Sequence, residues 1–354
     1  MLKILLVGLN NNENIGDVII SDCTRYLLKR VLKNLKVKDF NITCIDMTLE
    51  EYSLIEKSDL IILAGGGIIK YKYQKFYYYI DQIISIAEKS KVPVIFNGVG
   101  VEGYDPDDEK CILLQKAINN PWVKQITVRD DIELMERKYI ENKKIHLEKV
   151  ADSAVWASDV FNIHKKKDST IIGLGMLREG IFRSNGIDLG LEELLRLWSE
   201  IIAELEAKEI QWQIFTNGWP SDMKFALNLM KYLKREDEIG EKVIAEPQGS
   251  KELIETISNY RGIIAGRLHA NIVAYSLKIP SVGIVWNDKC SFWGENIGYP
   301  ERYFRHNEFD GRRIVDTCLK AIKEGYNEYA RDEYKMSSYN SLYSYMKRFI
   351  KENV

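Results

Sequence analysis

The chain has 354 residues, a length that suggests roughly two domains. Lys and Arg total 50 against 52 Asp and Glu, so the formal net charge of −2 argues against a protein built mainly to hold a nucleic-acid backbone. Hydrophobic residues make up 45% and charged residues 29%, which is typical of a folded globular protein and excludes widespread disorder. The five cysteines are far apart and form no CxxC pair, so we expect neither a disulfide framework nor a zinc knuckle.

No segment predicts export or membrane insertion. The apolar run at residues 1–8 is too short for a signal peptide, and a polar loop rich in Asn follows it. No stretch approaches the roughly 18 uninterrupted apolar residues that a membrane span needs. We therefore expect a cytoplasmic protein with no membrane span.

Short apolar runs alternate with helical patterns in the first half of the chain. The predicted strands are 2–7, 42–46, 60–64, 94–97, 126–128 and 145–150. The predicted helices are about 17–35, 74–90, 107–118 and 130–140. This βαβ alternation predicts a doubly wound parallel sheet in a Rossmann-like domain at residues 1–165.

The pattern restarts after a charged interval at 164–169, which is typical of a solvated linker. The next predicted strands are 170–174, 212–215, 242–245, 262–265 and 281–285, and the helices are 191–207, 221–233, 251–258 and 267–277. We expect a second Rossmann-like domain at 168–310. Parallel sheets bind ligands beyond the carboxyl ends of their strands, so the expected site is a cleft that the two domains face.

The tail at 311–354 is predicted to be helical. Apolar or aromatic residues recur there at spacings of three and four, namely Met336, Tyr339, Tyr343, Met346 and Ile350. This amphipathic stripe favours packing over function, and one expectation is that the helices return to the first domain. An exposed part of the Tyr-rich tail would also be compatible with a homodimer.

The loop after the first strand contains Asn14, Gly16 and Asp17 just before a helix. Its glycine spacing is not that of a dinucleotide-binding fingerprint, and it lacks the Lys of a P-loop. Asp17 is either a helix cap or a carboxylate that contacts a substrate hydroxyl and removes its proton. Both interpretations stay open from the sequence.

Three glycines, Gly65, Gly66 and Gly67, follow the strand at 60–64. They allow close backbone approach, and exposed N–H groups there could cradle an anion, whereas a tight turn would need only one glycine. The run at 70–79 then interleaves Lys with aromatic residues. We interpret it as a helix with a buried aromatic face, with Tyr71 as a candidate for stacking on a sugar ring, and we disfavour single-stranded nucleic acid because the chain is not basic.

Two arginines come directly after predicted strands. Arg129 lies where a ligand-facing side chain would lie, and the alternative is an ion pair with a neighbouring acid. Arg178 holds the equivalent position in the second domain.

The sharpest pattern is Gly266, Arg267 and His269, at the turn from a buried strand into a helix. Cations are disfavoured at a helix N-terminus because the helix dipole is already positive there, so two of them suggest an anionic ligand. The alternative without a ligand is a structural His and a surface Arg. Lys289 follows the next strand and adds a further positive group. No cluster at metal-ligand spacing and no nucleophile elbow is evident, so we expect no metal and no cofactor.

Taken together, these residues resemble the polysaccharide pyruvyl transferase family. The resemblance covers almost the whole chain up to about residue 290. It rests on the loop 14–17, the glycines 65–67, Arg129 with Asp130, Arg267 with His269, and Lys289. The segments 97–100 and 151–154 are looser matches.

The resemblance implies a GT-B-like fold and transfer of a pyruvyl group from phosphoenolpyruvate to a sugar of a cell-surface glycan or its lipid-linked precursor. On that basis Arg129, Arg267, His269, Lys289 and the glycines 65–67 would bind the donor, with His269, Arg267 and Asp17 catalytic. A lipid-linked acceptor would bring the protein to the inner face of the membrane.

Two other functions fit the same residues. One is a GT-B glycosyltransferase that uses a nucleotide sugar, because a helix N-terminus with Arg and Lys also suits a diphosphate. The other is a non-catalytic module that binds a glycan or an anion.

Overall fold

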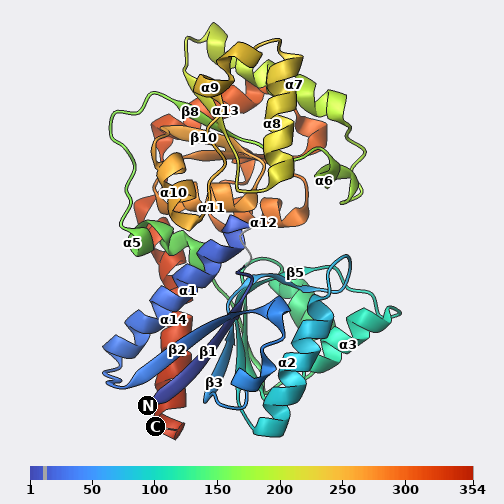
Figure 1. Ribbon diagram of the computed structural model, residues 1–354, viewed down its shortest axis with the longest axis vertical. Helices are drawn as coiled ribbons and strands as arrows, with labels where there is room; N and C mark the ends of the chain where they lie inside the picture. The colour runs from blue at the N-terminus through green and yellow to red at the C-terminus, as the bar shows by residue number, and fades with distance from the viewer. Residues whose placement is uncertain (11–13, 354) are drawn as a thin grey trace. The chain divides into compact units, whose positions relative to one another are not determined.

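The computed structural model describes residues 1–10 and 14–353 and divides them into two compact units (Figure 1). The first unit comprises residues 1–10, 17–153 and 332–353. The second comprises residues 14–16 and 154–331.

Within the described residues, the first unit contains a seven-stranded parallel sheet in the order β2-β1-β3-β5-β6-β7, with β4 paired to β5. Its strands are β1 (Leu2–Gly8), β2 (Phe40–Asp46), β3 (Leu60–Leu63), β4 (Gly66–Lys70), β5 (Val94–Glu102), β6 (Val123–Val128) and β7 (His146–Lys149). Its main helices are α1 (Ile15–Asn34), α2 (Phe76–Ser90), α3 (Glu109–Ile118), the short α4 (Ile132–Leu134) and α14 (Glu328–Asn353), of which α1 and α14 start in the second unit.

Side chains on alternate positions of these strands build two apolar layers. Leu5, Leu63 and Phe96 belong to the core that α2 and α3 cover. Helices α1 and α14 lie over the other face of the sheet (Figure 1). On that face Gln125 of β6 donates to the hydroxyl of Ser341 on α14 at 3.3 Å.

The C-terminal helix α14 is tied to the first unit by both packing and polar contacts. Met346 is fully buried and Tyr339 is nearly so. The hydroxyl of Tyr339 accepts a hydrogen bond from Asn34 of α1 at 2.6 Å, and the guanidinium of Arg30 lies 5.3 Å from the Tyr339 ring centroid. The amphipathic stripe of the tail is therefore used for packing.

The second unit holds a five-stranded parallel sheet among its described residues, in the order β12-β11-β10-β8-β9. The strands are β8 (Ile172–Gly175), β9 (Trp212–Phe215), β10 (Gly262–Ala265), β11 (Ser281–Ile284) and β12 (Tyr303–Phe304). The helices are α5 (Ala157–Phe161), α6 (Gly180–Arg183), α7 (Leu191–Ala207), α8 (Pro220–Tyr232), α9 (Ile239–Lys242), α10 (Ser250–Ser258), α11 (Leu268–Ser276), α12 (Asp288–Asn296) and α13 (Gly311–Glu324). Helices α7 and α13 pack together on one face of the sheet, and α10 and α11 lie on the other (Figure 1).

The predicted fold class is confirmed, but two predicted elements were wrong and two strands were not predicted. Residues 242–245 form no strand, because only Val243 pairs, through a single bridge to Ile214. Strand β4 was not predicted because it begins inside the glycine triplet, and β12 has only two residues. The helix predicted at 130–140 is the short α4 followed by a π-helical turn at Met135–Tyr139.

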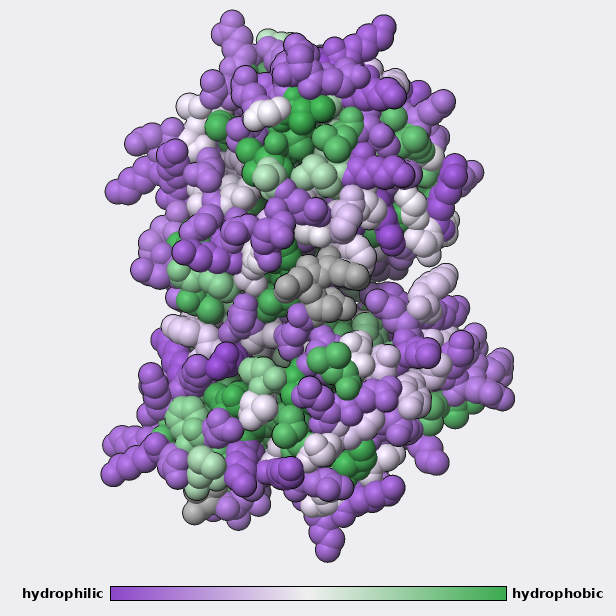
Figure 2. Space-filling view, in the orientation of Figure 1, coloured by the Kyte–Doolittle hydropathy of each residue, from purple (hydrophilic) through white to green (hydrophobic). Residues whose placement is uncertain are grey.

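Hydrophilic side chains predominate on the viewed face, with hydrophobic ones gathered in smaller areas on each unit (Figure 2). No helix within residues 1–10 and 14–353 is long and apolar enough to cross a membrane. In the same residues no group of three or more His, Cys, Asp or Glu side chains is arranged to hold a metal ion.

Candidate functional site

In the first unit, the glycine triplet is required by the backbone at two positions. Gly65 has φ +100° and Gly66 has φ +85°, a region that side chains other than Gly rarely adopt. A Cβ atom at Gly65 would also lie 2.8 Å from a methyl group of Ile20. The turn therefore needs two glycines, and the third, Gly67, is already in β4.

Arg129 follows β6 and is anchored at both its backbone and its side chain. Its N–H donates to the carbonyl of Val99 at 3.0 Å, and its guanidinium pairs with Asp152 and lies 3.9 Å from the carboxylate of Asp130. Asp130 in turn accepts from the N–H of Val101 at 2.9 Å. The ion pair that the sequence left as an alternative is present.

Burial of Arg129 disfavours its charge, but Asp152, Asp130 and Asp17 outweigh that effect and raise its pKa. Arg129 is 6% exposed, so it is a buried cation held by acids rather than a surface group. A guanidinium in this state is fixed in orientation, which suits a side chain that positions a ligand.

Asp17 and the glycine triplet belong to the same region of the first unit. A Cβ atom at Gly66 would lie 3.5 Å from Oδ1 of Asp17, and one at Gly67 would lie 4.0 Å from Nη2 of Arg129. Three predicted elements, Asp17, the glycines and Arg129, are therefore neighbours. Tyr71, by contrast, is 4% exposed and belongs to the apolar core.

In the second unit, β10 turns through Gly266 into α11. A Cβ atom at Gly266 would lie 1.5 Å from Leu177, and the Gly266 carbonyl accepts a hydrogen bond from the Trp286 indole at 2.8 Å. Arg267 is the N-cap residue of α11, and His269 lies in the first turn. Gly266 is needed because the side chain of Leu177 occupies the space that a side chain at position 266 would fill.

Arg267 already has an anionic partner within the protein. Its Nε and Nη2 atoms donate to the two oxygens of Asp222 at 2.7 and 2.6 Å. Asp222 is fully buried in the first turn of α8. Asp222 therefore balances the positive charge of Arg267 within the protein. The position of Arg267 at a helix N-terminus does not by itself require an anionic ligand, as the sequence had suggested.

Arg178 joins the same arrangement through Asp222 and Trp219. The N–H of Arg178 donates to Asp222 at 2.9 Å. The guanidinium carbons of Arg178 and Arg267 lie 5.8 and 5.6 Å from the Trp219 ring centroid. The carboxylate of Asp222 and the indole of Trp219 therefore each contact both arginines.

His269 lies against the N-terminal segment 14–16, which belongs to the second unit. A Cβ atom at Gly16 would lie 2.1 Å from Nδ1 of His269. Ile15 packs in a similar way against Gly218, because a Cβ atom at Gly218 would lie 2.6 Å from the Cδ1 methyl group of Ile15. Two glycines therefore allow this segment, which includes Asn14, to pack beside the histidine.

Lys289 is in the first turn of α12, with its ammonium 4.6 Å from the Trp286 ring centroid. Burial raises the pKa of the neighbouring Cys290 to about 11, although Lys289 and Arg267 both lower it. The Cys290 thiol is therefore protonated near neutral pH and is not a nucleophile. Lys289 and Arg267 act on the same thiol, which puts both in one part of the second unit.

Several buried polar atoms at the carboxyl end of this sheet have no hydrogen-bond partner among the described residues. They include Oγ1 of Thr216 and Oδ1 of Asn217 after β9, and Oδ1 of Asn287 after β11. All three residues follow the carboxyl ends of β9 and β11, the end at which parallel sheets bind ligands.

The sequence interpretation missed Asp222, Trp219 and Asp152 as functional candidates. A signal was present for the first two, because Trp219-Pro220 marks a helix start directly after a strand. Asp152 was noted only as part of a loosely matching segment, and nothing in the sequence indicates its pairing with Arg129.

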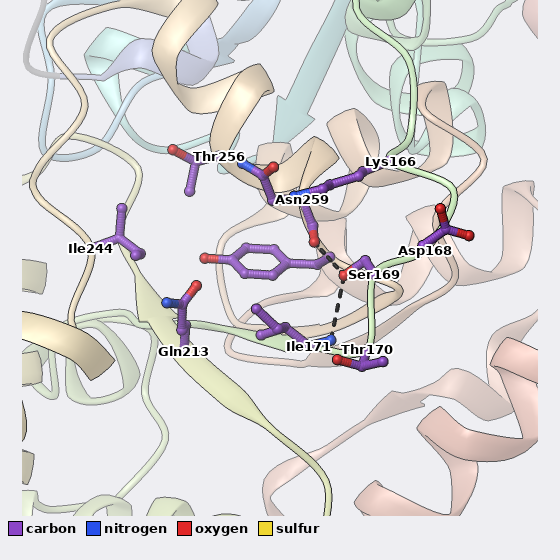
Figure 3. A pocket seen from close by; sticks show the side chains of 10 residues that line it. Lys166, Asp168, Ser169, Thr170, Ile171, Gln213, Ile244, Thr256 and Asn259 are labelled. Carbon is purple, nitrogen blue, oxygen red and sulfur yellow. Dashed lines mark hydrogen bonds between the residues drawn. The ribbon is translucent and has the colours of Figure 1, made fainter.

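A separate hollow of about 320 Å³ lies at the amino end of the second sheet (Figure 3). Lys166, Ser169, Gln213 and Thr256 are among its lining residues. It contains none of the residues predicted to act on a ligand. Because parallel sheets bind ligands at the carboxyl ends of their strands, we do not assign the reaction to it.

Comparisons with solved structures identify the class of fold. The UDP-GlcNAc 2-epimerase of Methanocaldococcus jannaschii is 14% identical, with 98% of this chain and 99% of that chain covered and a TM-score of 0.61. A putative UDP-N-acetylglucosamine 2-epimerase of Listeria monocytogenes is 10% identical, with 100% and 97% covered and a TM-score of 0.59. The chain therefore has the GT-B type of fold, with two Rossmann-like units.

A comparison with family models identifies the family. The family model for polysaccharide pyruvyl transferase matches residues 14–288. The chain belongs to the polysaccharide pyruvyl transferase family. A comparison with curated proteins gives no match.

Proposed function

We propose that this protein transfers the pyruvyl group of phosphoenolpyruvate to a sugar of a cell-surface glycan or its precursor, forms a cyclic ketal and releases phosphate. Family membership supports a transferase of this kind. The observation that carries the proposal is the set of cationic or titratable side chains, Arg267, His269 and Lys289, after the adjacent strands β10 and β11. The fold alone does not require such a set.

The donor suits these groups because it carries a phosphate and a carboxylate. Charge-assisted hydrogen bonds from Arg and Lys are the strongest that a protein offers to such anions. We propose that Arg267 and Lys289 bind the phosphate or carboxylate, and that Arg129 and the N–H groups of Gly65–Gly67 are the donor-binding groups of the first unit. Arg178, held by Asp222, would assist through its neighbour Arg267.

The reaction balances without a cofactor. One sugar hydroxyl adds to C2 of the enol phosphate, C3 gains a proton and becomes a methyl group, and the hydroxyl proton passes to a base. The bond between C2 and the phosphate oxygen then breaks and phosphate leaves with its electron pair. A second hydroxyl of the same sugar adds to C2 and closes the ketal, and its proton leaves with a base or with the phosphate.

The titratable side chains have distinct proposed roles. His269 is the proposed acid or base for C3 or the leaving phosphate, because imidazole is the side chain that most often serves in general acid–base catalysis. Asp17 is proposed to orient or deprotonate the acceptor hydroxyl. Asn14 and Gly16 are proposed to position the segment that packs beside His269. A lipid-linked acceptor, action at the inner membrane face and a homodimer belong to the same proposal.

A donor-binding experiment separates this function from a nucleotide-sugar enzyme. Isothermal titration of the protein with phosphoenolpyruvate and, separately, with UDP-GlcNAc is expected to give binding to the first only. Phosphate release in the presence of a glycan, with a product that carries the ketal methyl group in its NMR spectrum, then tests turnover. Binding of UDP-GlcNAc alone would overturn the proposal, and donor binding without any phosphate release would favour a non-catalytic module.

A further inference from the structure

Tyr73, in the loop between β4 and α2, is the one aromatic residue among the eight non-glycine residues with a left-handed backbone in the described part of the chain. Its side chain is 83% exposed, and its backbone is left-handed with φ +65°. A left-handed conformation costs a residue with a bulky side chain free energy, and such strain concentrates at functional sites. An exposed ring does not recover that cost by burial, so packing does not explain why the ring is presented here.

A series of contacts links this ring to Arg129 within the first unit. A Cβ atom at Gly67 would lie 4.0 Å from the Arg129 guanidinium and 3.1 Å from the carboxylate of Glu102. The other oxygen of Glu102 is 3.0 Å from the ammonium of Lys70. That ammonium lies 5.9 Å from the Tyr73 ring centroid. The ring is thus a few side chains away from the candidate donor-binding arginine.

The charges around the loop indicate what the ring would contact. Lys70 is paired with Glu102, and the ammonium of Lys72 is hydrogen-bonded to the side chain of Tyr71 and lies 5.2 Å from its ring centroid. The ammonium that lies over the Tyr73 ring therefore already has an acidic partner, and the ring is the exposed aromatic group of the loop. This favours a neutral sugar over an anionic lipid surface or a nucleic acid.

We propose that Tyr73 stacks on a sugar of the acceptor glycan, beyond the sugar that receives the pyruvyl group. This inference rests on the proposed function, because it concerns the acceptor of that reaction. The C–H face of a pyranose packs on an aromatic ring, and a Tyr side chain has only two χ angles to fix on binding. Tyr73 takes the role expected for Tyr71, whose side chain is buried.

The kinetic test uses acceptors of increasing length. For Tyr73→Ala, the KM for acceptors of three or more sugars is expected to rise about 3- to 10-fold, which corresponds to the loss of one aromatic stack. The KM for phosphoenolpyruvate and turnover with a monosaccharide acceptor stay unchanged. Tyr73→Trp restores the longer acceptors, and Tyr73→Gly, which tolerates the left-handed backbone, matches Tyr73→Ala.

Tyr329→Ala is the matched control because Tyr329 is 80% exposed in the second unit and has no assigned role. It is expected to leave every acceptor constant unchanged. An equal loss for monosaccharides and longer acceptors in Tyr73→Ala, or no loss for any acceptor, would overturn the proposal.

A binding measurement separates this inference from the proposed function. Isothermal titration with cello-, chito- and galacto-oligosaccharides of one to six sugars is expected to show binding that Tyr73→Ala weakens and Tyr329→Ala does not. If the protein transfers no pyruvyl group yet shows this pattern, the reaction is wrong and the stacking role stands. Equal binding by Tyr73→Ala and the unaltered protein, or no binding of any of these sugars, would contradict the stacking role. Binding only to phosphatidylglycerol vesicles would identify a lipid-contact loop and would equally overturn it.

Discussion

The buried carboxylate of Asp222 accepts two hydrogen bonds from Arg267, at 2.7 Å from Nε and 2.6 Å from Nη2. Because a guanidinium is planar, this bidentate contact fixes the direction of its other edge, which carries Nη1. The same carboxylate accepts the N–H of Arg178. Asp222 therefore acts as the anchor of the arginines in the second unit, and the substrate contacts proposed for Arg267 would depend on it.

Asp222→Asn is expected to lower the free energy of unfolding by about 2–4 kcal/mol, because it removes one partner of a buried ion pair. It should also raise the KM for phosphoenolpyruvate by about tenfold or more, since Arg267 loses its orientation. Chemical denaturation and steady-state kinetics measure the two effects. Asp316→Asn is the control, because Asp316 pairs with Lys208 at 3.2 Å on the surface and should cost less than about 1 kcal/mol. Similar losses in the two variants would contradict the anchoring role.

Gly16→Ala is expected to reduce turnover at least tenfold, because the new Cβ atom would lie 2.1 Å from Nδ1 of His269 and one of the two must move. Gly240→Ala provides a matched control, since a Cβ atom at Gly240 has no other atom within 4 Å. Phosphate release measures the effect, and circular dichroism checks that both variants fold. Full activity of Gly16→Ala would show that the position of His269 is not critical.

Arg129→Lys is expected to raise the KM for phosphoenolpyruvate about tenfold or more while the protein stays folded. Lysine keeps the charge beside Asp152, but it lacks the planar fork that fixes a bidentate contact. Arg137→Lys is the control, because the Arg137 side chain is 74% exposed. An unchanged KM in Arg129→Lys would restrict Arg129 to an ion pair within the protein.

Stability is expected to fall as the pH rises above 9. Burial raises the pKa of Cys290 to about 11 and that of Cys318 to about 12, from an ordinary value of 9.0. Between pH 9 and these values the unfolded chain releases the thiol protons and the folded protein keeps them. The unfolded state thus binds fewer protons, so the free energy of unfolding declines with pH, by about 3 kcal/mol for a shift of two units.

Denaturant unfolding at pH 8 to 11 checks this dependence. The double variant Cys290→Ala/Cys318→Ala should show a shallower decline than the unaltered protein. Part of the slope will remain because burial also raises the pKa of Tyr52, to about 12. An identical slope in the double variant would rule out the thiols as the cause.

Much of the fold was predictable because buried parallel strands have a strong local signature. Trp212–Phe215 and Gly262–Ala265 were predicted with the bounds that the structure has, since each is a short apolar run between turn residues. The run 242–245 has similar composition, but it pairs through Val243 alone. Pairing depends on residues far away in the sequence, and a local pattern does not contain them.

The candidate site was predictable only at its sequence-local parts. Gly266, Arg267 and His269 are consecutive or nearly so, and their position after a strand was enough to select them. The partner of Arg267 is Asp222, 45 residues away, and the neighbour of His269 is Gly16. Such contacts follow from the order of strands in a sheet. The sequence could therefore select Gly16 and the cations as candidates, but it could not predict Asp222 or show which residues lie side by side.

The most direct test of the central claim is phosphate release from phosphoenolpyruvate with and without a glycan acceptor, in the unaltered protein and in His269→Ala. The account predicts acceptor-dependent release accompanied by a ketal product, and a loss of at least a hundredfold in His269→Ala, within the range for removal of a general acid or base. Acceptor-dependent release that is undiminished in His269→Ala would contradict the account.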